Sequence, residues 1–105
     1  MKLLEFLEDR TYDLRLRWID KNTEAEISYV NEVIKINLEL MLAKTIAHEF
    51  LHDCYPDLSE KEIIAKTRKY LHRMKVSEIK AVGRLTFKQM ILWKIEQKLE
   101  EVGNG

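Results

Sequence analysis

Two histidines four residues apart, with a glutamate beside the first, are the residues of this chain whose types and spacing could do chemistry. His48, Glu49 and His52 lie in the pentapeptide H-E-F-L-H. In an α-helix, residues four apart project from one face, so both imidazoles can reach a single metal ion. A catalytic zinc site takes three protein ligands and leaves one position for water. Glu49 would act as general base on that water, which is the chemistry of metal-assisted peptide hydrolysis.

The residues around the pentapeptide predict the helix that must present it. The run from Leu40 to Cys54 contains no Gly or Pro and is rich in helix-forming residues. Pro56 ends the helix, because the residue before a proline is pushed out of the helical region. The side opposite the motif is predicted to be buried. Its residues are Ala43, Ala47, Phe50, Leu51 and Cys54.

A third ligand is expected on the next helix. Ser59 with Glu62 three residues later forms a capping box, which predicts a helix over residues 60–74. The loop over residues 55–58 is short, and such connections usually return the second helix alongside the first.

The remaining histidine of the chain lies on this second helix. His72 follows His52 by twenty residues and is the predicted third ligand. Glu60 and Glu62 are the alternatives, since carboxylates also bind zinc. Capping explains Glu62 as well, and the preference of acids for the first helical turn explains Glu60.

This layout resembles that of the gluzincins, the thermolysin-like zinc peptidases, in which the third ligand is usually Glu. With His in that position, a length near one hundred residues and a strand-rich segment before the motif, the chain most resembles the minigluzincins, which are small soluble archaeal zinc peptidases. The likeness covers Leu14 to Met74, and its specific part is the pentapeptide. It implies zinc held by His48, His52 and His72, with Glu49 as base and acid.

Composition limits the other function classes. The chain has 105 residues, which is enough for one minimal metallopeptidase domain over residues 1–105. Lys plus Arg and Asp plus Glu number 18 each, so no net field selects nucleic acid or an anionic membrane. Cys54 is the only cysteine, so no disulfide can form within the chain. Without a signal peptide or an apolar span, the expected location is the cytoplasm.

The pattern before the motif predicts an α+β fold. A short helix over Leu3–Leu7 is followed by three segments that alternate apolar and polar residues, at Leu14–Trp18, Ala25–Tyr29 and Ile34–Leu38. Short connections favour a small antiparallel three-stranded sheet, packed on the active-site helix and further helices. The resemblance implies that this fold is a minimal gluzincin-like zincin. In such a fold the strand Val33–Leu38 would form the upper rim of the cleft, where its exposed edge would bind an extended peptide by strand addition.

The C-terminal part is expected to form a separate helix. A short turn from Ser77 ends at Gly83, and Thr86 with Gln89 opens a helix over residues 86–102. Its core stripe and its opposite side are both apolar, which predicts a helix that shields the cleft, packs on a partner or is buried on both faces. The stripe is Phe87, Ile91, Ile95, Leu99 and Val102, and the opposite side carries Met90 and Trp93. The G-R-L-T segment is a candidate hinge for a homodimer.

The leading interpretation is a zinc-dependent metalloendopeptidase acting on a peptide or protein substrate. The resemblance implies a latent zymogen whose C-terminal segment blocks the cleft. The alternative is a small non-catalytic interaction module with structural zinc or none. A structural site needs four protein ligands, and Cys54 is predicted on the far face from His52, which favours the open site. The oxyanion-stabilising residue stays open among Tyr55, Tyr70, Arg68, Arg73 and Arg84.

Overall fold

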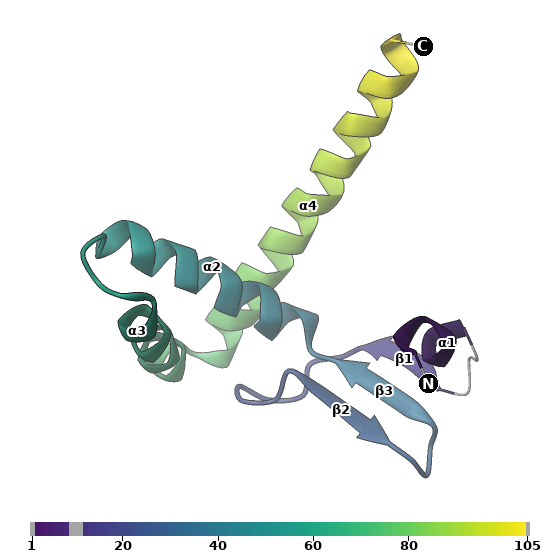
Figure 1. Ribbon diagram of the computed structural model, residues 1–105, viewed down its shortest axis with the longest axis horizontal. Coiled ribbons are helices and arrows are strands. Elements are labelled where there is room, and N and C mark those ends of the chain that lie inside the picture. Colours follow the sequence, from purple (N-terminus) through teal and green to yellow (C-terminus); the bar gives the residue numbers. More distant parts are fainter. Residues whose placement is uncertain (1, 9–11, 105) are drawn as a thin grey trace. The chain divides into compact units, whose positions relative to one another are not determined.

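The computed structural model describes residues 2–8 and 12–104 and has the expected α+β composition (Figure 1). The chain falls into two compact units, Met1–Leu38 and Glu39–Gly105. The first unit holds helix α1 (Leu3–Glu8) and strands β1 (Asp13–Leu16), β2 (Ala25–Ser28) and β3 (Val33–Ile36). The predicted short helix and the three predicted strands are therefore confirmed in position. In the described part of the chain, no helix is long and apolar enough to cross a membrane.

The order of the strands differs from the prediction. They lie in the order β1-β3-β2, with β3 parallel to β1 and antiparallel to β2, so the sheet is mixed. The predicted antiparallel meander is wrong. The edge role expected for Val33–Leu38 is also wrong, because β3 is the central strand and has a neighbour on both sides. The edges of the sheet are β1 and β2.

A buried asparagine explains this order. Asn37 directly follows β3, and its side-chain amide donates to the carbonyl oxygens of Asp20 and Thr23 at 3.0 and 3.1 Å. The loop over residues 17–24 is thereby held against the end of β3 and leads β1 to the far side of that strand from β2. The Asp20 carboxylate accepts hydrogen bonds from the backbone N–H of Asn22 and from the Thr23 hydroxyl, and these bonds lower its pKa. The loop is therefore also held by hydrogen bonds within itself.

The second unit consists of three helices, α2 (Leu38–Cys54), α3 (Glu60–Arg73) and α4 (Val76–Asn104). The two helices predicted around the motif and after Ser59 are confirmed. Their buried residues recur every three or four positions, as a helix with one inner face requires. The buried side chains of this unit are Leu40, Ala43, Ala47, Leu51, Ile63, Thr67, Leu71 and Ile79. Phe50 and Cys54 were predicted to be buried and are exposed, so the inner face of α2 is narrower than expected.

Helix α4 runs without a break through Gly83, where the sequence predicted an end. The hydroxyl of Thr86 donates to the carbonyl oxygen of Val82 at 2.8 Å within the helix, so Thr86 does not cap a new one. Gly83 is buried, and a Cβ atom placed on it would overlap the backbone of Glu39. The glycine therefore serves the close approach of α4 to the start of α2, and the predicted G-R-L-T hinge is continuous helix.

The C-terminal half of α4 leaves its apolar side chains in solvent. Among the described residues after Thr86, none is buried. The predicted core stripe is therefore wrong, because its members and those of the opposite side are all exposed. These are Phe87, Ile91, Ile95, Leu99 and Val102 of the stripe and Met90 and Trp93 of the opposite side, and Leu92 is exposed as well.

Candidate metal centre

The two histidines of the pentapeptide lie one turn apart on the same face of α2. Their ring centroids are 4.8 Å apart, and the Nε2 atoms of His48 and His52 approach to 3.1 Å. Both side chains are half-buried, with 22% of His48 and 34% of His52 exposed. The two rings lie on one face of α2, as the four-residue spacing predicted, and both direct Nε2 toward the same point.

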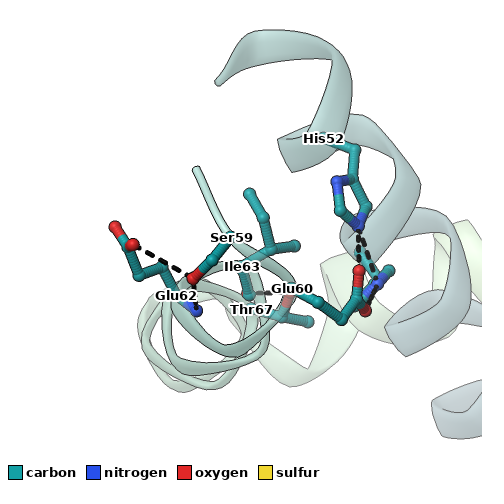
Figure 2. Close-up of polar contacts among 7 residues, drawn as sticks. His52, Ser59, Glu60, Glu62, Ile63 and Thr67 are labelled. Carbon is teal, nitrogen blue, oxygen red and sulfur yellow. Dashed lines mark hydrogen bonds and ion pairs between the residues drawn. The ribbon is translucent and has the colours of Figure 1, made fainter. Parts of the chain in front are cut away.

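A carboxylate from α3 completes this group. Glu60 Oε1 lies 2.7 Å from His48 Nε2, and Glu60 Oε2 lies 2.7 Å from His52 Nε2. Figure 2 shows His52 from α2 and Glu60 from α3 pointing toward one another. The ligand-type atoms of the three residues all lie within 4.8 Å of one another. With the proton on Nε2, each ring donates one hydrogen bond to a different carboxylate oxygen.

The start of α3 fixes where Glu60 lies. Ser59 is the N-cap, and its hydroxyl oxygen accepts from the Glu62 N–H at 3.3 Å while the hydroxyl donates to the Glu62 carboxylate at 3.0 Å (Figure 2). Glu62 is thus engaged at the cap, as the sequence suggested. Glu60 is the first residue of the helix, directly after the short loop from α2, and so comes next to the last turns of α2.

The structure does not bring His72 to this group. His72 lies twelve residues after Glu60 on the same helix, which is about 18 Å along its axis. The expected side-by-side return of α3 is replaced by a crossing, and in Figure 1 α2 lies lengthwise while α3 is seen nearly end-on. Toward the other end of α3, Tyr70 packs on Phe50 with ring centroids 5.9 Å apart. Phe50 lies on the side of α2 away from the histidines. Helix α3 therefore begins beside the histidine side of α2 and ends beside the opposite side.

The three side chains are of types that bind zinc, although the two N–O distances of 2.7 Å are those of hydrogen bonds and would have to lengthen around an ion. Two nitrogens bound to one tetrahedral zinc at about 2.0–2.1 Å are roughly 3.3 Å apart, close to the separation found here. Two imidazoles with one carboxylate form a ligand set known for catalytic zinc, whereas calcium and magnesium prefer oxygen donors throughout. Binding requires that Nε2 of both rings lose its proton, so the hydrogen bonds to Glu60 would be exchanged for metal bonds.

Glu49 is exposed and does not belong to the group of converging atoms. It is the neighbour of His48 and precedes His52 by three residues, which keeps it on the same side of α2. Glu49 takes no part in the contacts among His48, His52 and Glu60, so its carboxylate is available for proton transfer.

Two of the candidates for oxyanion stabilisation are engaged elsewhere. Arg84 pairs with Glu39 at 3.3 Å, at the opposite end of α2 from the histidines, and Tyr70 packs on Phe50. Tyr55 lies three residues after His52, with the Lys66 ammonium 4.5 Å above its ring centroid. Tyr55 is therefore the candidate nearest to the histidines along the chain.

The sequence itself contains a signal that Glu60 lies beside the histidines. Only seven residues separate Glu60 from His52, and the loop between them is short. A ligand near the start of α3 needs no assumption about how the two helices cross, whereas a ligand near its end does.

No known protein family, curated protein or solved structure matches this chain.

Proposed function

We propose that this chain is a zinc-dependent metallopeptidase, with His48, His52 and Glu60 as ligands and Glu49 as general base. The observation that carries the proposal is the convergence of the two Nε2 atoms, 3.1 Å apart, on one carboxylate at 2.7 Å from each. A zinc ion at this point would lower the pKa of a bound water and polarise the carbonyl of a substrate peptide bond.

In this proposal Glu49 moves the proton. Its carboxylate accepts a proton from the attacking water and then gives it to the leaving amine, so the residue serves as base and as acid. His48 and His52 need neutral rings with free Nε2 lone pairs, and Glu60 supplies the negative charge of the ligand set. His72 remains the alternative third ligand that the minigluzincin resemblance implies.

A non-catalytic interaction module is the second candidate, and one observation favours it. The same three side chains form a complete hydrogen-bonded bridge between α2 and α3, because each ring can donate to one oxygen of Glu60. Such a bridge stabilises the unit without metal or chemistry.

One experiment separates the two candidates. Zinc content and hydrolysis of fluorescently labelled casein are measured for the wild type, Glu49→Gln and Asp53→Asn, in the full-length chain and in a form shortened after Leu85. Asp53 is a matched control, since it is an exposed acid on the same helix and outside the group.

We expect zinc in all three proteins and hydrolysis in all but Glu49→Gln, because the amide keeps the shape of the side chain but cannot take a proton. Equal hydrolysis by Glu49→Gln would remove the proposed mechanism. A zinc-free, inactive wild type in both lengths would instead support the interaction module.

We further propose that two copies of the chain pair through the C-terminal half of α4. Its exposed apolar side chains need a cover, and its charges are divided along the helix. Lys88 and Lys94 lie in the first part without an acid, whereas the second part carries the acids Glu96, Glu100 and Glu101 and one cation, Lys98. An antiparallel pair would bring each basic part against the acidic part of the second copy. In this proposal the pair of chains is the latent form of the peptidase, and the monomer is the more active one.

A further inference from the structure

Zero net charge hides an uneven distribution along the chain. Ten of the 18 Lys and Arg residues, but only two of the 18 Asp and Glu residues, lie between residues 61 and 94. The acids are Glu62 and Glu78. The cations are Lys61, Lys66, Arg68, Lys69, Arg73, Lys75, Lys80, Arg84, Lys88 and Lys94.

The first five of these cations share the outer face of α3. The inner face of this helix is marked by Ile63, Thr67 and Leu71, which are buried at three- and four-residue spacing. At 3.6 residues per turn, the cations fall on the remaining side of the helix. Each of them is exposed, and we refer to them together as the basic face. They are Lys61, Lys66, Arg68, Lys69 and Arg73.

Little within the chain neutralises the basic face. Among the described residues, no carboxylate forms an ion pair with Arg68, Lys69 or Arg73. Glu62 is the one acid on this side of α3, and it is bound to the Ser59 hydroxyl at 3.0 Å. Lys66 lies over the Tyr55 ring, which leaves its charge intact.

The chemistry of the basic face selects among anionic partners. An amphipathic helix that enters a membrane surface needs a broad exposed apolar side. The centre of the apolar side of α3 is buried in the unit, and the large apolar side chains that this helix exposes are Ile64 and Tyr70 at its margins. Protein interfaces are depleted in Lys and are centred on buried aromatic or aliphatic anchors, which this face lacks. Nucleic-acid phosphates require only accessible cations.

We propose that the basic face of α3 binds the phosphate backbone of nucleic acid, without reading its sequence. From Lys61 to Arg73 the face extends about 18 Å, a length over which duplex DNA carries roughly ten phosphate charges. Its cations lie on the outer side of α3, and none of them belongs to the group formed by His48, His52 and Glu60. This inference does not depend on the proposed peptidase activity, and it revises the expectation that nucleic acid is no partner.

The test is the affinity of the full-length chain for a fluorescein-labelled 20-base-pair DNA duplex, measured by anisotropy between 50 and 200 mM salt. If all five cations meet phosphates, the slope of log K against log salt is about −4.5, and affinity falls about 500-fold over this range. Lys69→Gln combined with Arg73→Gln should reduce the slope to about −2.7. Glutamine keeps the helix propensity of the face, and circular dichroism checks the fold of each variant.

A control with the same change in net charge is Lys2→Gln combined with Lys98→Gln, both exposed and outside the basic face. It should keep the wild-type slope. Equal losses in both double variants would overturn the proposal, because net charge and no particular face would then be responsible. Stronger binding to poly-glutamate or to anionic phospholipid vesicles than to DNA would also overturn it, in favour of an acidic protein or a membrane surface.

Discussion

The carboxylate of Glu60 contacts two histidine rings at once, and this contact decides which residues compete for a metal ion. Each of its oxygens lies 2.7 Å from one Nε2 atom. A carboxylate in that place either binds the ion together with the histidines or has to move aside for another ligand. His72 lies near the other end of the same helix as Glu60, so α3 would have to move relative to α2 for His72 to replace it.

The first prediction compares these two residues. Glu60→Ala should weaken zinc binding by more than about 100-fold, since changes to groups that only support a ligand already cost about 10–100-fold. His72→Ala should bind zinc like the wild type. Affinity is measured by competition with a chelating dye, and circular dichroism confirms that α2 and α3 are retained. The reverse result, with zinc lost only in His72→Ala, would return the third ligand to His72 and show that the helices rearrange on binding.

The pentapeptide could be placed from the sequence because both histidines belong to one helix. Their spacing alone puts Nε2 of His48 and His52 near one another. Whether His72 lies beside them depends on how α3 crosses α2, which is decided by the packing of Ile63, Thr67 and Leu71 against the rest of the unit. That packing is a tertiary property, and no pattern within α3 encodes it.

At the scale of the elements, periodicity predicted where helices and strands lie but not how they connect. β3 was placed correctly and so was its antiparallel pairing with β2, but its parallel pairing with β1 was not predicted, because the side chain of Asn37 holds a loop that the strand pattern does not include. Gly83 and Thr86 were interpreted as a helix end and a new cap. Inside a helix a glycine costs only about 1 kcal/mol relative to alanine, and the close approach to Glu39 outweighs that cost.

The second prediction concerns this close approach. Gly83→Ala should destabilise the chain by about 1–3 kcal/mol, because the added methyl group would force α4 away from the backbone of Glu39. Alanine normally stabilises a helix interior, so the sign of the effect is diagnostic. Urea unfolding measures it.

Gly103→Ala is the matched control, since a Cβ there meets nothing within 4 Å. It should leave stability unchanged or raise it slightly. If Gly83→Ala were also neutral or stabilising, the contact between α4 and the start of α2 would not be tight in solution.

At the scale of the whole chain, the proposed pairing through the exposed part of α4 would connect oligomeric state to activity. Among the described residues of this part, the large apolar side chains are exposed. Their exposure gives no support to the prediction that α4 shields the cleft within one copy. Pairing of two copies would bury the same side chains and would make latency depend on protein concentration.

The third prediction tests this pairing. The full-length chain should have about twice its 12.6 kDa mass in light scattering, and Ile95→Glu should be monomeric because a carboxylate would enter the apolar stripe. Gln97→Glu is the control, since it adds the same charge on the other side of α4 and should remain paired. If hydrolysis is measurable, the monomer should be the more active form. A monomeric wild type at high micromolar concentration would exclude pairing.

The bridge from His48 and His52 to Glu60 also bears on the order in which the protein is assembled. Hydrogen bonds from His48 and His52 to Glu60 join the end of α2 to the start of α3, and the buried side chains of this unit come from all three of its helices. In the proposed metallopeptidase, folding would therefore be completed first, and zinc would enter a site whose donors already converge. Such a protein would differ from zinc fingers, whose folding depends on the metal. A newly made chain would then be able to wait in its folded form, with zinc supply setting the time at which its chemistry begins.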